Sequence, residues 1–255
     1  MNAPTDLDVE LEVTTLLASF RLPTASREMV RRVREAGQEE ALPAVLEVLR
    51  AEAEGRKMRR VERLRQASKL PMGKTMSTLD SAIFGLDLQR TLRELAAGRF
   101  LDQATNVLAF GLPGTGKTHA SCALGHALVE AGHSVLFTPA YKLVQDLLAA
   151  KRDLGLPRAL RKLDAYELIV LDDIGYIKQR PDEVEVLFTL MAERYERRSL
   201  MITSNLVFSE WDQIFQNPMT TAAAVDRLVH HSVILEFDVP SYRTAGKLAA
   251  AEGRS

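Results

Sequence analysis

The sequence predicts an α/β protein in which a parallel sheet is flanked by helices, with a small helical domain before it. Short apolar runs alternate with helical segments from about residue 80 onward, and each run is nearly continuous rather than alternating apolar with polar. Continuous apolar runs are typical of strands that are buried on both faces of a parallel sheet. Residues 9–68, in contrast, have helical spacing and no such runs.

The composition is that of an ordinary globular protein of one or two domains. Of the 255 residues, 46% are hydrophobic and 26% are charged, and the formal net charge is −1. The single cysteine, Cys122, excludes an internal disulfide and fits a reducing compartment. No signal peptide is recognisable, and no apolar run approaches the roughly 18 residues of a membrane helix. We therefore expect a cytoplasmic protein that has no membrane partner.

Three regions are expected along the chain. Residues 1–70 form the N-terminal helical domain, for binding DNA or a partner, and Pro23 and Pro43 are expected to divide it into several short helices. Residues 71–105 are a linker and the start of the core, because the first of them include Pro71, Gly73 and Thr75. Residues 106–255 form the core itself.

The core is expected to contain five strands and the helices between them. Each expected strand is short, apolar and rich in β-branched or aromatic residues. The expected strands are 106–110, 135–138, 168–171, 200–203 and 233–237, and the expected helices are 117–131, about 140–152 and about 182–197.

A glycine-rich loop carries the first functional motif. It matches G-x-x-x-x-G-K-[ST] at every fixed position, follows an expected strand and begins an expected helix, so the core is a P-loop NTPase. Backbone N–H groups of such a loop, together with the helix N-terminus, bind phosphate oxygens. Lys117 is expected to reach the β- and γ-phosphates of ATP, and Thr118 to ligate Mg²⁺. The nucleotide-binding residues are Gly111, Leu112, Pro113, Gly114, Thr115, Gly116, Lys117, Thr118 and His119.

Acidic and polar residues follow two further strands. Asp172 and Asp173 end the strand at 168–171, where paired charges are costly unless a cation or hydrogen bonds receive them. We expect Asp172 to bind Mg²⁺ with Thr118, and Asp173 to polarise the attacking water. Asn205, after the strand at 200–203, is expected to hold that water or contact the γ-phosphate, and a plain turn residue is the alternative.

Six segments of the core occur in an order and at a spacing that are typical of one family. They are 111–119, 171–176, 193–196, 202–205, 226–231 and 241–243. On these segments the chain resembles the AAA+ ATPases of the DnaC/IstB type, and it is most similar to the IstB-like helper ATPases of bacterial insertion sequences. Weaker family-like motifs extend from about residue 70 to 101.

The resemblance implies roles for three further positions. Asn205 resembles a sensor residue, Arg227 an arginine finger that acts on the nucleotide of a neighbouring subunit, and Arg243 a second sensor. A finger acting in trans implies a homo-oligomer, whereas without the resemblance Arg227 would be a surface arginine paired with Asp226. The chain departs from the common AAA+ pattern at Asp173, where most AAA+ proteins have Glu, so hydrolysis is expected to be slow. Only twelve residues follow Arg243, too few for the usual C-terminal lid.

A basic stripe precedes the core. Arg56, Arg59, Arg60 and Arg63 have the spacing of one helix face, and between residues 56 and 74 eight lysines and arginines face one glutamate. Such a stripe can follow the backbone of duplex DNA without reading its sequence, and a solvated helix face is the alternative. The evenly spaced His119, His126 and His133 are joined by no cysteine or acidic ligand set, so no zinc site is predicted there.

The leading functional hypothesis is an ATP-dependent regulator of transposition. With ATP and Mg²⁺ bound, subunits would assemble on target DNA and recruit or activate the transposase of the same insertion sequence. DNA or that partner would stimulate hydrolysis. A DnaC-like loader of a replicative helicase, and a nucleotide-gated DNA-binding module with little turnover, are the alternatives.

Overall fold

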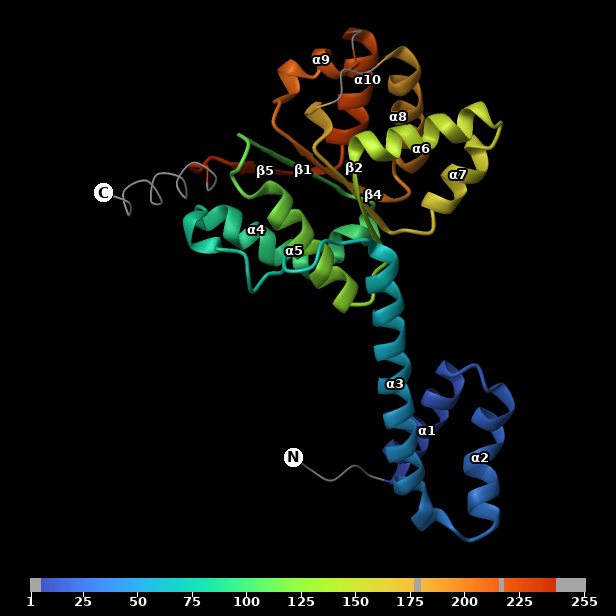
Figure 1. Ribbon diagram of the computed structural model, residues 1–255. Coiled ribbons are helices and arrows are strands. Elements are labelled where there is room, and N and C mark those ends of the chain that lie inside the picture. The colour runs from blue at the N-terminus through green and yellow to red at the C-terminus, as the bar shows by residue number, and fades with distance from the viewer. Residues whose placement is uncertain (1–5, 177–179, 216–217, 242–255) are drawn as a thin grey trace. The chain divides into compact units, whose positions relative to one another are not determined.

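The computed structural model describes residues 6–176, 180–215 and 218–241 (Figure 1). The chain divides into two compact units, Met1–Glu62 and Arg63–Ser255, and the division falls within helix α3 (Leu42–Ser68). No helix in the described ranges is both long enough and apolar enough to cross a membrane.

The first unit is a helical domain built from α1 (Asp6–Ser19), α2 (Pro23–Glu35) and the first part of α3. A short 3₁₀ helix, η1 (Glu39–Ala41), precedes α3. Pro23 and Pro43 each lie in the first turn of a helix, where the missing N–H has no partner in any case. With 27 residues, α3 is therefore longer than the short helices expected. The small core contains Val9, Val13, Leu17, Leu42 and Leu46.

Exposed ion pairs connect the helices of this unit. Arg50 on α3 donates through Nε and Nη2 to the two carboxylate oxygens of Glu12 on α1, at 2.7 and 2.6 Å. This hydrogen bonding lowers the pKa of Glu12 below its ordinary value. Arg34 on α2 also forms an ion pair, through Nη2 alone, with Glu10 on α1. The links between helices at this surface are therefore largely electrostatic.

The second unit is built on a five-stranded parallel sheet in the order β2-β3-β4-β1-β5. β1 to β4 are buried on both faces for most of their length, as their continuous apolar runs predict, whereas the edge strand β5 is partly exposed. All five expected strands are present. Their bounds are β1 (Asn106–Gly111), β2 (Val135–Pro139), β3 (Leu168–Asp172), β4 (Ser199–Ser204) and β5 (Ser232–Phe237).

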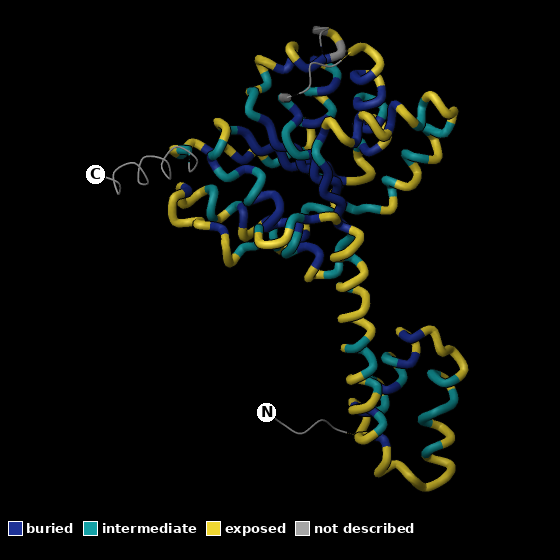
Figure 2. Tube along the Cα trace, viewed as in Figure 1, coloured by how far each residue is buried: buried dark blue, intermediate teal, exposed yellow. Residues whose placement is uncertain are grey.

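Helices cover both faces of the sheet, which confirms the expected layered α/β fold (Figure 1). α4 (Leu86–Ala96) and α5 (Lys117–Glu130) lie on one face, and α6 (Ala140–Arg152), α8 (Pro181–Arg194) and α10 (Pro218–Val229) lie on the other. The tube coloured by burial shows the strands as the most buried part of this unit (Figure 2). The remaining elements are α7 (Leu156–Leu163), α9 (Asp212–Phe215), η2 (Ser81–Ile83), η3 (Arg99–Gln103), η4 (Ile174–Tyr176) and η5 (Phe208–Glu210).

One buried cation joins several of these elements. Arg194, at the end of α8, is only 1% exposed, and its guanidinium bonds to backbone carbonyls rather than to a carboxylate. Nη1 donates to the carbonyl of Leu163 at 3.0 Å, while Nη2 donates to those of Tyr166 at 2.9 Å and Ser199 at 3.0 Å. Burial lowers the pKa of Arg194 to about 10, which leaves it charged at neutral pH. Arg194 thereby connects α8 to the segment that enters β3 and to the start of β4.

Replacing this cation tests how much the fold depends on it. We expect Arg194→Met to lower the free energy of unfolding by about 3 kcal/mol, because at least three buried carbonyls lose their donor. Urea denaturation followed by circular dichroism measures the change. The control is Arg198→Met, which removes an exposed arginine and should change stability by less than about 0.5 kcal/mol. Equal stability of Arg194→Met and the parent would contradict this expectation.

Candidate nucleotide site

The predicted phosphate loop joins the end of β1 to the start of α5. Gly111 has φ 153°, and a Cβ there would lie 2.6 Å from the carbonyl oxygen of Phe237 on β5. Gly116 has φ 98°, a conformation that side chains rarely adopt, and it sits against the ring of Phe84. Glycine is therefore required at both ends of the loop. The loop opens directly into the N-terminus of α5, the arrangement in which backbone N–H groups bind an anion.

The ammonium group of Lys117 lies over this same loop. Its Nζ donates to the carbonyl oxygens of Gly111 at 2.6 Å and Leu112 at 2.8 Å, and the side chain is largely buried. The lysine charge is therefore held at the loop by two carbonyls. In this position it can neutralise phosphate oxygens that bind to the loop.

The phosphate loop and the acidic end of β3 meet at one carboxylate oxygen. Thr118 Oγ1 donates to Oδ1 of Asp172 at 2.8 Å, across 54 residues of sequence. Thr203 Oγ1, on β4, donates to the same oxygen at 2.8 Å and accepts the N–H of Asp173 at 2.8 Å. A hydroxyl and a carboxylate are the hard oxygen ligands that Mg²⁺ prefers, so this pair fits the ion.

Asp173 has an unusual backbone conformation. Its φ is +63°, in the left-handed region where Asp and Asn are several-fold enriched among non-glycine residues. The short side chain of Asp can bond locally to the backbone there, which reduces the cost of this conformation. The local backbone therefore gives a physical reason for Asp at the position where most AAA+ proteins have Glu.

Asn205 lies directly after β4 and contacts the segment that follows β3. A Cβ placed on Gly175 would lie 2.1 Å from Asn205 Oδ1, so Gly175 leaves the room that the amide occupies. Oδ1 of Asn205 is buried and has no hydrogen-bond donor among the described residues. Such an atom usually bonds to a water or a ligand group, and this fits the predicted role of holding a water.

Arg227 lies away from the phosphate loop of its own chain. Its guanidinium carbon is 4.5 Å from the centroid of the Phe188 ring, and α10 leads into the amino end of β5, opposite the end where the loop lies. Its Nη1 is buried without a hydrogen-bond partner in the described structure, and no ion pair to Asp226 is found there. Arg243, the other predicted sensor, lies outside the described residues.

The basic stripe is partly engaged within its own helix. Glu52 accepts from Arg56 at 2.7 Å and from Arg59 at 3.2 Å, and the Arg56 guanidinium also lies 4.2 Å from the centroid of the Phe20 ring. Glu52 lies four residues before the basic stretch 56–74, so the charge balance of that stretch does not include it. Arg60 and Arg63 lie further along α3, and DNA binding by all four arginines stays a prediction.

Phe84 is a candidate site residue that the sequence analysis did not identify. Its ring meets that of Phe237 edge-on, with centroids 5.3 Å apart, and it contacts the position of Gly116. Nearby, Thr78 Oγ1 is 3.0 Å from Nε2 of His119. Residues 78–84 therefore lie beside the phosphate loop. The only signal in the sequence was that this aromatic residue lies within the weaker family-like motifs of residues 70–101.

Several solved structures share the fold of this chain. The chain resembles DnaI (TM-score 0.55, 18% identity, 66% of this chain and 95% of that one) and the DnaC helicase loader (TM-score 0.53, 18% identity, 68% of this chain and 98% of that one). DnaA bound to AMPPCP and single-stranded DNA has a TM-score of 0.56 at 16% identity, over 68% of this chain and 52% of that one. At these identities the likeness establishes the fold alone, which is that of an AAA+ P-loop NTPase.

Sequence comparison identifies the family. The model of the IstB-like ATP binding proteins matches residues 15–250. An insertion sequence ATP-binding protein of Sinorhizobium fredii (strain NBRC 101917 / NGR234) is 40% identical over 249 residues, covering 96% of this chain and 83% of the relative. The insertion sequence IS21 ATP-binding protein of Pseudomonas aeruginosa is 40% identical over 204 residues, covering 79% and 76%. The chain belongs to the family of IstB-like ATP binding proteins, which confirms the resemblance stated above.

The contribution of the Thr203 hydroxyl to the stability of the fold can be measured independently of ATP hydrolysis. We expect Thr203→Val, which keeps the shape of the side chain, to lower the free energy of unfolding by about 1–3 kcal/mol because the amide of Asp173 loses its acceptor. Urea denaturation measures the change. The matched control is Thr189→Val, whose hydroxyl donates to the Glu185 carbonyl one turn earlier in α8. An equally small effect of both substitutions would show that the bridge at Thr203 adds no stability.

Proposed function

We propose that this protein binds ATP and Mg²⁺ at the loop 111–118 and hydrolyses the nucleotide. The observation that carries the proposal is the 2.8 Å hydrogen bond between Thr118 and Asp172, because it brings a P-loop hydroxyl and an acidic strand end to one place. Family membership supports ATP as the nucleotide, since the family and its relatives are described as ATP-binding.

Each residue at the site has a role that follows from its position. The loop N–H groups and Lys117 bind the phosphates, while Thr118 and Asp172 hold Mg²⁺, which supplies positive charge at the phosphate oxygens. Asp173 accepts a proton from the attacking water, and Asn205 orients that water through its buried amide oxygen. Since Asp is one methylene shorter than Glu, we propose that unstimulated turnover is slow. Phe84, beside the loop, is the proposed contact for the base.

We further propose that the protein regulates transposition as an ATP-dependent assembly on DNA. The relatives are named as insertion sequence proteins, which makes the transposase of the same element the proposed partner. Arg56, Arg59, Arg60 and Arg63 are the proposed contacts to duplex DNA. Arg227 is the proposed finger for the nucleotide of the next subunit, since it lies away from its own loop and Phe188 fixes the position of its guanidinium.

The protein that the assembly binds distinguishes a regulator of transposition from a helicase loader, the main alternative. A helicase loader would retain a replicative helicase in a pull-down, whereas a transposition regulator would retain the transposase of its element. Phosphate release that is stimulated by DNA would exclude a module that uses ATP only as a structural ligand.

Removal of the loop lysine tests nucleotide binding. We expect Lys117→Ala to weaken ATP binding by about tenfold or more, because one charge-assisted contact to phosphate is lost. Calorimetry with ATP and Mg²⁺ measures the affinity, and electron microscopy with duplex DNA in ATP and in ADP measures assembly, which should also be lost. Lys142→Ala, a lysine of α6, is the control. Undiminished assembly by Lys117→Ala would overturn the proposal.

A mixing experiment tests the finger in trans. We expect Arg227→Ala to retain ATP binding and to lose most of its DNA-stimulated phosphate release, about a hundredfold or more. Mixing Arg227→Ala with Asp173→Asn, which keeps the phosphate loop, should restore part of the activity, because a subunit with an intact catalytic acid then meets a neighbour with an intact finger. A mixture that is no more active than its components would show that Arg227 does not act between subunits.

A further inference from the structure

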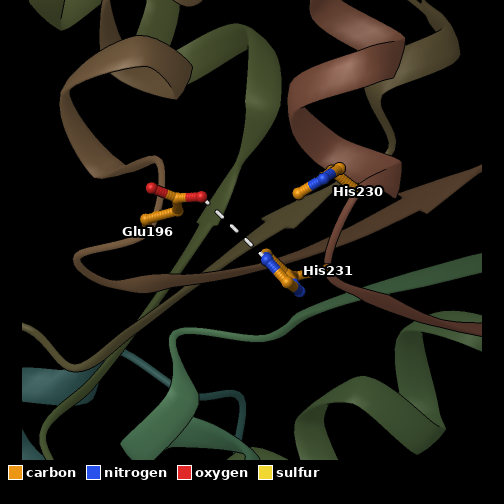
Figure 3. Close-up of side chains that lie close together, drawn as sticks. All are labelled: Glu196, His230 and His231. Carbon is orange, nitrogen blue, oxygen red and sulfur yellow. Dashed lines mark ion pairs between the residues drawn. The ribbon is translucent and has the colours of Figure 1, made fainter.

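Three side chains converge at the opposite end of the sheet from the phosphate loop. Glu196, His230 and His231 point toward one another (Figure 3), and one possible ligand atom of each lies within 4.8 Å of the other two. The distance from His231 Nε2 to a carboxylate oxygen of Glu196 is 4.0 Å. Within the described parts of the chain, no other group of three His, Cys, Asp or Glu residues meets this condition. The nucleotide site uses none of the three.

We propose that Glu196, His230 and His231 form a binding site for a divalent transition metal ion of intermediate hardness, such as Zn²⁺. Two imidazoles and one carboxylate are a donor set that binds Zn²⁺, with bonds of about 2.0–2.2 Å. Tetrahedral ligand atoms at these bond lengths lie about 3.4 Å apart. The site therefore closes by roughly 1 Å through rotation of exposed side chains, and water takes the fourth position.

The ends of two helices favour a cation at this place. α8 ends at Arg194 and α10 ends at Val229, so Glu196 follows one helix terminus closely and His230 follows the other directly. The C-terminus of a helix carries partial negative charge, which stabilises a nearby cation. The closest basic side chain in sequence, Arg197, has its charge balanced by Asp164 at 2.6 Å and by Glu193.

The hydroxyl of Tyr195 contacts the second ring nitrogen of one proposed ligand, His230, and orients its imidazole. The hydroxyl oxygen of Tyr195 is 3.3 Å from Nδ1 of His230. Burial and then the neighbouring Glu196 raise the pKa of Tyr195 above its ordinary value. If the Nδ1–H of His230 donates to the tyrosine oxygen, Nε2 of His230 is left for the ion. Metal-binding histidines commonly have such a partner on their second nitrogen.

The other histidines of the chain have separate partners. Nε2 of His126 is 3.1 Å from the carbonyl oxygen of Pro71, and Nδ1 of His133 is 3.0 Å from the carboxylate of Glu167. The proposed ion would join the ends of α8 and α10, the two helices that hold Phe188 and Arg227 against each other. Because Arg227 lies about one helical turn before His230, the bound ion would affect the position of the Arg227 guanidinium.

Calorimetric titration of the untagged full chain with Zn²⁺ tests the site. The titration is done without nucleotide and in millimolar Mg²⁺, so that Mg²⁺ occupies the hard oxygen ligands at Thr118 and Asp172. We expect one Zn²⁺ per chain, and at least tenfold weaker binding in both His231→Ala and Glu196→Gln. Tyr195→Phe should weaken binding less than either. Co²⁺ in place of Zn²⁺ should give visible absorption bands that the same ligand substitutions remove.

The matched control is His133→Ala, which removes a histidine that also pairs with a glutamate, elsewhere in the same unit. It should leave the stoichiometry and affinity for Zn²⁺ unchanged. Since the three proposed ligands are exposed, their substitutions should leave the metal-free melting temperature unchanged, and only the parent should melt higher in Zn²⁺. Parental affinity in His231→Ala, or loss of the Zn²⁺ equivalent in His133→Ala, would overturn the proposal.

Discussion

One carboxylate oxygen organises the candidate nucleotide site. Oδ1 of Asp172 accepts hydrogen bonds from Thr118 on α5 and from Thr203 on β4, so it connects a helix and two strands at a single atom. This convergence depends on the strand order, which sets β3 beside β4 and β4 beside β1. Because all three strands are parallel, their carboxyl ends meet at one edge of the sheet. The loop, the acidic strand end and Asn205 gather there for that reason.

Much of the second unit could be predicted from sequence because its strands are buried on both faces. Such strands need continuous apolar residues, and the motif around Lys117 has a fixed spacing that the fold preserves. The helices α4, α7, α9 and α10 were not among the expected ones, and the contact of Phe84 with Gly116 was missed for a different reason. Phe84 meets residues that lie more than thirty positions away, and periodicity within a segment carries no information about such a contact.

The partners of the charged side chains were harder to predict than the fold. The four arginines of the stripe were recognised by their spacing, but the pairing of two of them with Glu52 depends on helical geometry just outside the stretch that was counted. Arg194 belongs to a segment that supported the family resemblance, yet its burial among carbonyls was not visible in the sequence. In both cases the partner of the charge, rather than the charge itself, decides what the residue does.

The contrast between the buried and the exposed arginines has a consequence for the effect of ionic strength. The guanidinium of Arg194 bonds to neutral carbonyls inside the protein, where dissolved ions cannot reach it. The pairs Arg50–Glu12 and Arg34–Glu10 lie at the surface, where added salt screens them. Concentrated salt should therefore loosen the helices of Met1–Glu62 while the nucleotide-binding unit retains its packing, so the two parts of the chain differ in their tolerance of the surrounding electrolyte.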